Sequence, residues 1–350
     1  MPHSPRSELA LALCSLPKAE VHVHLEGCFE AATLEQWAAE ARVAMPRPLD
    51  TLFQFGGLAD FLRFLDWACG LANTPERLAR LAYDFCERLQ KDGTGYADVI
   101  VNPTHWSVWR GQTKAMIEAL DQGFALAEQN GLPRIGLCVS LLRTQTADEA
   151  TELVEQLVEL RSPRVVALSV DGNEAAAGRT GPRFADAFRR AGAAGLKRTV
   201  HAGESSGPDG VRDAIELLGA DRIDHGVRAI EDDAVVALLV ERGIPLGVCP
   251  TSNIALKVYS SMEAHPLDRL RRAGVRISIN TDDPSLLGTN LLQEYEIARV
   301  AYGWTEDILR HVARTSIEAS FASPEIKAKL TGNLNSWRMG SAAAIAGSSI

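Results

Sequence analysis

Short runs of apolar and β-branched residues alternate along the chain with longer stretches of helical period. The short runs predict eight strands, at residues 19–24, 96–101, 134–141, 165–170, 197–201, 222–225, 244–248 and 276–280. Apolar positions with helical spacing, typical of amphipathic helices, fill the intervening segments, such as 146–162, 183–196, 209–219 and 232–243. Eight strand-helix units in 350 residues favour a (β/α)8 barrel over an open doubly wound sheet. We therefore expect an α/β protein with a TIM-barrel fold.

The segment between the first two predicted strands, residues 31–92, is too long for a single helix. It contains a dense apolar cluster of Phe61, Leu62, Phe64, Leu65 and Trp67. This cluster belongs either to a helix that packs on the barrel or to a lid that closes over a small ligand, as in many barrel enzymes. We expect one domain over 1–350, with a helical insertion or lid at 31–92 and a flexible, small and polar tail at about 333–350.

Composition excludes several classes of partner. The net charge of −9 and isoelectric point near 5.5 leave no basic footprint for a phosphate backbone, so we expect no nucleic-acid partner. No apolar run approaches the roughly 18 residues of a membrane span, and the first residues lack the pattern of a signal peptide. We expect a cytoplasmic protein without a membrane partner, and the sequence leaves a homo-oligomer open. The six cysteines lie far apart without a C-x-x-C motif, which predicts mostly buried thiols.

Polar side chains cluster where six of the eight predicted strands end. In a barrel of this type the chemistry takes place at the carboxyl ends of the strands. The clusters are HVHLEG (22–27), DGNE (171–174), HAGE (201–204), DHG (224–226), CPTSN (249–253) and NTDDP (280–284). One histidine or one Asp-Asp pair at a strand end is usually structural, but several on one rim indicate a functional site.

Four of these residues form a candidate metal site. His22 and His24 are two apart in a strand and so point to the same side. With His201 and a carboxylate from Asp282 they make a nitrogen-rich set with one oxygen, which suits zinc or another late divalent metal. The fourth strand ends without the lysine that bridges two metals in many barrel hydrolases, so we expect one metal per chain.

The neighbouring residues indicate hydrolysis. A divalent cation lowers the pKa of bound water towards ~7 and makes hydroxide available near neutral pH. Glu204 follows His201 by three residues, so its carboxyl could face a substrate, and His225 could hydrogen-bond the water. Asp283 could share a proton with a substrate heteroatom, although spacing alone leaves open which of Asp282 and Asp283 binds the metal.

The motifs, in this order, resemble the adenosine deaminase family of the amidohydrolase superfamily. The resemblance extends from LPKAEVHVHLEG through DGNE, TVHAGE, RIDHGV and CPTSN to NTDDP and SIEASFASPEIKAKL. It implies hydrolytic deamination of a small-molecule purine at C6, with release of ammonia. It also implies that zinc is held by His22, His24, His201 and Asp282, that Glu204 gives a proton to N1, and that His225 assists the water. The substrate contacts that it implies come from His24 and Glu26, from Asp283 at N7 and from the Gly172 backbone at N3.

Departures from the family pattern bear on the substrate. Glu26 stands where nucleoside enzymes commonly have Asp, and NPTH (102–105) is similar to a segment of adenine deaminases. In contrast, DGNE keeps the Gly and Glu arrangement of the nucleoside enzymes. We expect adenosine first, with adenine or a modified nucleoside (6-aminodeoxyfutalosine or an N6-substituted compound) as the alternatives.

Two rival functions and one local detail complete the sequence-based expectations. A zinc-binding barrel without catalysis could dispense with Glu204, and its presence argues for an enzyme. A metal-dependent esterase or phosphodiesterase would favour two metals or a basic pocket, and neither is indicated. Ser205 and Ser206 are expected to cap the following helix rather than touch the substrate.

Overall fold

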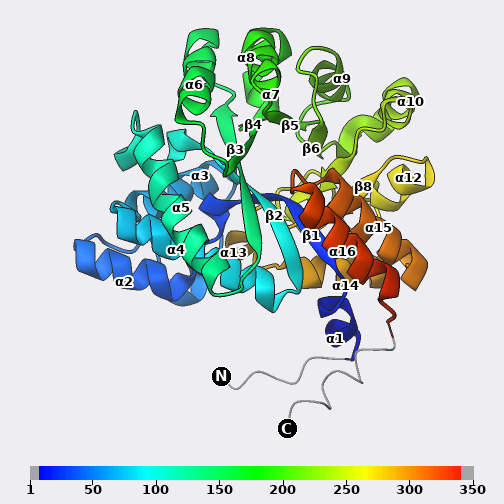
Figure 1. Cartoon of the computed structure of the whole chain (residues 1–350), viewed down its shortest axis with the longest axis horizontal. Coiled ribbons are helices and arrows are strands. Elements are labelled where there is room, and N and C mark those ends of the chain that lie inside the picture. Colours follow the sequence, from blue (N-terminus) through cyan, green and yellow to red (C-terminus); the bar gives the residue numbers. More distant parts are fainter. Residues whose placement is uncertain (1–7, 340–350) are drawn as a thin grey trace.

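Eight parallel strands follow one another in sequence order around the computed structural model, which describes residues 8–339, without the side chains of 58 and 59 (Figure 1). The prediction of a (β/α)8 TIM barrel is confirmed. The strands are β1 Lys18–His24, β2 Thr94–Val101, β3 Arg134–Leu142, β4 Val165–Asp171, β5 Lys197–Ala202, β6 Arg222–His225, β7 Leu246–Val248 and β8 Ile277–Ile279.

Helices surround the strands as an outer layer (Figure 1). They are α1 Glu8–Cys14, α2 Ala31–Ala41, α3 Leu58–Leu71, α4 Pro75–Lys91, α5 Thr113–Gln129, α6 Ala147–Leu160, α7 Glu174–Ala177, α8 Gly181–Ala193, α9 Asp209–Glu216, α10 Asp233–Arg242, α11 Pro250–Ala255, α12 Leu267–Arg272, α13 Pro284–Leu287, α14 Leu291–Tyr302, α15 Glu306–Ala319 and α16 Pro324–Ser336. Short 3-10 turns are η1 Leu25–Gly27, η2 Leu49–Thr51, η3 Pro103–His105, η4 Ser107–Trp109 and η5 Val227–Glu231. No helix of the described residues is long and apolar enough to cross a membrane.

Burial extends to both faces of the strands and includes their polar residues. Every residue of β1 except His24 is buried, and all of β6, β7 and β8 is buried. A parallel sheet covered by helices on one face and closed on the other has no solvent-facing side. Five of the six cysteines are also buried, which confirms that prediction.

Side chains complete the barrel where β8 meets β1. Asn280 Oδ1 accepts hydrogen bonds from the backbone N–H of Val21 at 2.7 Å and of His22 at 3.2 Å. Beyond it, the backbone N–H of His24 donates to the carbonyl of Asp282 at 2.7 Å. These bonds fix Asp282 beside the two histidines of β1.

A charged cluster spans the barrel interior. Arg222 of β6 reaches Asp98 of β2 at 2.7 Å and Asp224 of its own strand at 3.3 Å, and all three side chains are fully buried. Since β2 and β6 are four strands apart in a ring of eight, this pair crosses the barrel. Breaking one partner of such a buried pair would leave an uncompensated charge, which costs about 3–5 kcal/mol.

The segment between β1 and β2 forms α2, α3 and α4. Helix α3 contacts η1, η3 and η4, the turns that follow β1 and β2, so it lies over the carboxyl ends of those strands. Phe61, Phe64 and Leu65 are buried and Leu62 is 37% exposed. The apolar cluster therefore packs inward, as the first interpretation of this segment requires.

The tail expected over 333–350 begins with ordered residues. Helix α16 continues to Ser336, and the following Trp337 is only 5% exposed. The indole nitrogen of Trp337 donates to Ser15 Oγ at 3.1 Å, which ties the end of α16 to the region before β1. Residues 340–350 lie outside the described part of the chain.

Candidate active site

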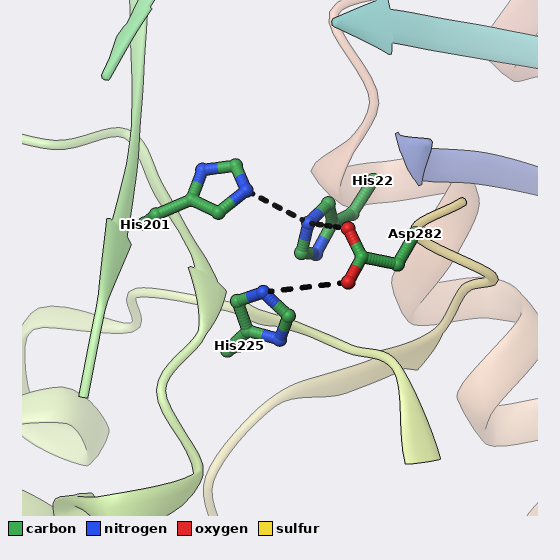
Figure 2. A group of neighbouring side chains, drawn as sticks. All are labelled: His22, His201, His225 and Asp282. Carbon is green, nitrogen blue, oxygen red and sulfur yellow. Dashed lines mark hydrogen bonds and ion pairs between the residues drawn. The ribbon is translucent and has the colours of Figure 1, made fainter. Parts of the chain in front are cut away.

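Four predicted ligands converge at the carboxyl ends of β1, β5 and β8. His201 Nε2 lies 3.1 Å from His22 Nε2 and 3.0 Å from His24 Nε2. Asp282 Oδ1 lies 3.4 Å from His22 Nε2 and 3.3 Å from His24 Nε2. Figure 2 shows His22, His201 and Asp282 directed at one another, with His225 beside them.

These separations suit one metal ion. Zinc binds imidazole nitrogen and carboxylate oxygen at about 2.0–2.2 Å, so neighbouring ligands of a tetrahedral site lie roughly 3.3 Å apart. The four separations given above, 3.0–3.4 Å, are close to this value, and three nitrogens with one oxygen are a donor set that suits zinc. His225 also lies within 4.8 Å of His22, His201 and Asp282, but its Nε2 is 3.8 Å from Asp282 Oδ2. This longer distance suits a residue next to the metal rather than a ligand.

Surrounding groups orient the ligands. His22 Nδ1 lies 2.8 Å from the carbonyl of Gly247, which can only accept, so the proton is on Nδ1 and Nε2 keeps its lone pair for a metal. His201 Nδ1 faces the Asp224 carboxylate at 3.6 Å. Ser252 donates to Asp282 Oδ2 at 2.6 Å, which leaves Oδ1 directed at the histidines.

The backbone is strained at two site residues. His225 has a φ of 66° and Asp282 a φ of 65°, a left-handed conformation that non-glycine residues seldom adopt. Such strain costs of order 1–3 kcal/mol and persists only where the surroundings impose it. His225 ends β6, and Asp282 lies three residues after β8 in an isolated bridge with Val23, so the left-handed turn aims each side chain into the cluster.

Glu204 lies next to the metal ligands and is suited to carry a proton. Its Oε1 is 3.5 Å from His225 Nε2 and accepts a hydrogen bond from Asn253 Nδ2 at 3.4 Å. Burial, together with the negative charge of Asp282, raises the pKa of Glu204 to about 8. A carboxyl group with this pKa is largely protonated at neutral pH and can act as a general acid.

The loop that carries Glu204 is held by another carboxylate. Glu174 accepts hydrogen bonds from the backbone N–H of Gly203 at 2.9 Å, Glu204 at 3.1 Å and Ser206 at 3.1 Å. The expectation that the serines cap the following helix is wrong: Ser205 Oγ accepts instead from the backbone of Ala175, and α9 begins at Asp209 after an N-cap without a side-chain bond. The serine hydroxyl therefore joins the loop to α7, next to Glu174.

Asp283 lies beside Asp282 after β8, and Gly172 lies after β4. A side chain at Gly27 would place its Cβ 2.3 Å from Asp283 Oδ1, so glycine is required where η1 approaches Asp283. Burial and the nearby charges of Asp282 and Glu26 raise the pKa of Asp283 well above its ordinary range, so it can donate a proton. Gly172 follows β4 with a φ of +99°, next to Asp171, whose Oδ2 lies 4.0 Å from His24 Nδ1.

Glu26 is held on the other side of the site and is only 1% exposed. Its Oε1 accepts from the backbone N–H of Asn102 and from the indole Nε1 of Trp106, both at 2.7 Å. Its Oε2 is buried and has no hydrogen-bond partner among the described residues. Burial raises the pKa of Glu26.

Several of these partners lie within or beside the sequence motifs, but the sequence predicted no role for them. Ser252 and Asn253 belong to CPTSN, Glu174 to DGNE, and Trp106 follows NPTH. Position within a strand-end motif was the available signal for them. His265, which contacts Asn253, belongs to none of the motifs and carried no signal.

A barrel with this cluster at its carboxyl rim, and a protonatable carboxyl group beside it, has the architecture of a metal-dependent hydrolase. Comparison with known proteins identifies the family. The chain belongs to the adenosine deaminase family, whose model matches residues 17–337. The resemblance found in the motifs is thus confirmed.

Curated and solved relatives narrow the activity. The chain is 35% identical to an adenine deaminase of Rhizobium meliloti over 321 residues, covering 91% of this chain and 98% of the relative. It is 34% identical to an aminodeoxyfutalosine deaminase of Streptomyces avermitilis over 332 residues, covering 93% and 92%. A Burkholderia ambifaria amidohydrolase solved with bound Zn has a TM-score of 0.87 and 26% identity, covering 99% of this chain and 96% of that one.

These relatives establish a hydrolytic deaminase that acts on the C–N bond of an adenine-type substrate. They favour the two alternatives, adenine and a modified adenine nucleoside, over the adenosine expected first. The His/Asp cluster suits the metal site of the family.

Proposed function

We propose that free adenine is the preferred substrate and that the protein converts adenine and water to hypoxanthine and ammonia. The proposal is carried by Glu26, a buried carboxyl group with one oxygen anchored and the other without a partner. A buried polar oxygen of this kind is costly unless a ligand supplies its hydrogen bond.

Free adenine complements that oxygen. Its five-membered ring offers an N–H donor at N9, for which the free oxygen of Glu26 is an acceptor. A nucleoside lacks the N9 donor and needs room for its sugar. The indole of Trp106 is fully buried and donates a hydrogen bond to Glu26.

Zinc is the metal we propose, one ion held by His22, His24, His201 and Asp282. When bound there it supplies hydroxide near neutral pH, because it lowers the pKa of water to about 7. The donor set, the spacing of the four atoms and the Zn-bound relative support this assignment.

The remaining steps are assigned to the side chains of the chain itself. Glu204 gives its proton to N1 of the ring, which withdraws electron density from C6 and makes it open to attack by hydroxide. His225 hydrogen-bonds the attacking oxygen. Asp283 donates to N7 and the Gly172 backbone contacts N3. The new C6–O bond replaces the C6–N bond: the proton of the added hydroxyl passes to the amino group, which leaves as ammonia, and the proton released when water forms the hydroxide restores Glu204.

A modified adenine nucleoside of the aminodeoxyfutalosine type is the second candidate. The Streptomyces relative acts on such a compound by name, at nearly the same identity as the adenine deaminases. Gly172 and Glu174 also keep the arrangement of nucleoside enzymes after the fourth strand. A substrate hydroxyl would then supply the hydrogen bond to Glu26.

The insertion at 31–92 is proposed to cover the bound ring through α3. This helix lies over η1, which carries Glu26, and over η3. Across that contact Asp66 reaches His105 at 3.1 Å, and the Asp66 side chain is 65% exposed. A contact so exposed contributes at most about 1 kcal/mol, so it would not prevent α3 from moving.

The test is formation of the 6-oxo purine product by the zinc-loaded enzyme with adenine, adenosine, a 5′-modified adenosine and N6-methyladenine, the last of which would release methylamine instead of ammonia. We expect kcat/KM for adenine to exceed that for adenosine by about 100-fold, or ~2.7 kcal/mol of transition-state discrimination. Glu26→Gln keeps the acceptor for Trp106 but places an NH2 at the free position, so it should reduce kcat/KM for adenine at least about tenfold more than for adenosine. A nucleoside that leads in the wild type would overturn the proposal, and a 5′-modified adenosine that leads would support the second candidate.

A further inference from the structure

A buried histidine outside the strand-end motifs touches the catalytic side of the site. His265 precedes α12 and is 2% exposed. Its Nε2 lies 3.0 Å from Asn253 Oδ1, and the backbone N–H of Leu267 donates to its Nδ1 at 3.2 Å. Burial lowers the pKa of His265 to about 4, so the ring is neutral at physiological pH.

The contact with Leu267 determines the tautomer of His265. A backbone N–H can only donate, so Nδ1 of the neutral ring accepts and its proton lies on Nε2. The Nε2–H group then donates to Asn253. This bond fixes the side-chain amide of Asn253 with its oxygen towards His265, because the flipped amide would bring two donors together.

The fixed amide in turn determines the tautomer of His225. The NH2 group of Asn253 lies 3.2 Å from His225 Nδ1 and 3.4 Å from Glu204 Oε1. Its two hydrogens match these two acceptors. His225 Nδ1 therefore accepts, and the proton of its neutral ring lies on Nε2, the atom that faces Glu204 Oε1 and Asp282 Oδ2.

We propose that His265 and Asn253 are positioning residues that hold His225 in the Nε2–H tautomer. His225 then presents a fixed hydrogen-bond donor to the attacking oxygen and has no lone pair on Nε2 with which to act as its base. The inference deepens the proposed function and rests on the role given there to His225. It assigns a purpose to His265, which none of the catalytic motifs contains.

The direct test reads the protons on the histidine rings. The zinc-loaded full chain is labelled with 15N in its histidines, and long-range 1H–15N correlation spectra distinguish protonated from unprotonated ring nitrogens. A His225→Gln sample identifies the signals of His225. We expect an unprotonated Nδ1 and a protonated Nε2 in His225, and the same pattern in His265. A protonated Nδ1 in His225 would overturn the proposal.

Variants test whether the tautomer matters for turnover. Asn253→Asp offers acceptors in place of the NH2 group and should move the His225 proton to Nδ1. A wrong tautomer at a catalytic histidine can cost up to about 10⁴-fold, so we expect kcat to fall by at least about 100-fold, with KM changed by less than about threefold. An unchanged His225 spectrum together with unchanged kcat would count against the proposal that Asn253 holds the tautomer of His225.

Position 265 allows a rescue experiment. His265→Leu removes the donor and should lower kcat about tenfold, whereas His265→Gln can keep a donor towards Asn253 and should restore kcat to within about threefold. His311→Leu changes an exposed histidine of α15 and is the matched control. Zinc content and Tm identify variants that merely fold poorly. If both position-265 variants equal the wild type in kcat and in the His225 spectrum, His265 is not a positioning residue.

This test can succeed even if the preferred substrate is not adenine. The spectra are recorded without substrate, and kcat is measured with whichever 6-aminopurine is turned over fastest. Preference for a nucleoside would overturn the substrate proposal alone. A His225 with its proton on Nδ1 would overturn the positioning proposal alone.

Discussion

Two glutamates enter the site from opposite strands of the ring, and their surroundings differ. Glu204 follows β5; its side chain is 20% exposed and touches His225 and Asn253. Glu26 follows β1; it is 1% exposed and bonded to Trp106 and the Asn102 backbone. Burial raises the pKa of both. We call these the Glu204 side (Glu204, His225, Asn253, His265) and the Glu26 side (Glu26, Asn102, Trp106).

The difference separates catalysis from recognition. Glu204 is 20% exposed and has a pKa of about 8, so it can transfer a proton. Glu26 is anchored by two donors that hold their proton, and its free oxygen is suited to bind a fixed partner. Changes on the Glu204 side should therefore slow every 6-aminopurine by a similar factor, whereas changes on the Glu26 side should alter the ratio between substrates.

Removal of the metal should have the largest effect, because both sides depend on the ligands between them. We expect kcat to fall by at least about 10³-fold for every substrate, since hydroxide is scarce at neutral pH without the cation. Dialysis against a chelator, followed by titration with Zn²⁺ and metal analysis, measures this. Activity should return at about one equivalent per chain; full activity without metal, or a requirement for two equivalents, would contradict the single site.

Glu204→Gln should follow in size. The amide preserves the shape of the side chain but cannot give up a proton to N1, and general acids contribute about 10²–10⁴-fold. We expect such a loss in kcat for adenine and adenosine alike, with zinc content unchanged. Near-normal turnover would remove Glu204 from the mechanism.

The pH profile provides the control for this variant. The acid works when protonated, and its pKa is about 8, so kcat/KM of the wild type should be level below that pH and fall above it. The Glu204→Gln variant should lack this alkaline decline. An unchanged decline in the variant would assign it to another group.

Glu174→Gln should have an intermediate effect, because Glu174 acts only through the loop that carries Glu204. The substitution replaces one acceptor oxygen by a donor that opposes the N–H groups of the loop, and a misplaced catalytic group costs up to about 10²-fold. We expect kcat to fall about 10- to 100-fold for all substrates, with little change in KM. Glu35→Gln, on an exposed position of α2, is the control and should be unchanged in kcat. A loss confined to one substrate would place Glu174 in recognition instead.

The motifs predicted the Glu204 side more completely than the Glu26 side, and the reason is physical. Strand ends in a barrel meet at one rim, so residues such as His22, His201 and Asp282 could be brought together from their place in the strands alone. The residues that shape the backbone around them also belong to the motifs; Gly203, for example, lies between His201 and Glu204. The eight strands were predicted from their short runs of apolar and β-branched residues, although β7 begins at Leu246 rather than at 244.

Contacts between distant turns were not predictable in this way. Trp106 lies 80 residues from Glu26, and Glu174 bonds a loop about 30 residues away. Each contact depends on how two loops pack after the barrel has formed, and no periodicity encodes it. The role of His265 depends further on a chain of donors and acceptors that only coordinates reveal. The substrate recognition proposed for Glu26 depends on such contacts; the motifs favoured adenosine, whereas the relatives favour the adenine-type alternatives.

Trp106→Phe should have the smallest effect and the sharpest dependence on substrate. It removes the donor to Glu26 Oε1 but keeps an aromatic ring packed near Phe29. Glu26 then retains only the Asn102 bond and is less firmly oriented. A single hydrogen bond contributes about 0.5–1.5 kcal/mol, so kcat/KM for adenine should fall roughly 3- to 10-fold. The value for adenosine should change less, because it lacks the N9 donor that Glu26 is proposed to meet.

The matched control makes the same chemical change at a neighbouring indole. Trp109 is also buried, and its Nε1 donates to the carbonyl of Ala72 at 2.8 Å, away from Glu26. Trp109→Phe should lower Tm about as much as Trp106→Phe but leave the adenine-to-adenosine ratio of kcat/KM unchanged. If both variants shift that ratio equally, the effect arises from general loosening of the β2 turn. If neither shifts it, the hydrogen bond from Trp106 does not orient Glu26, and recognition on this side depends on the Asn102 backbone alone.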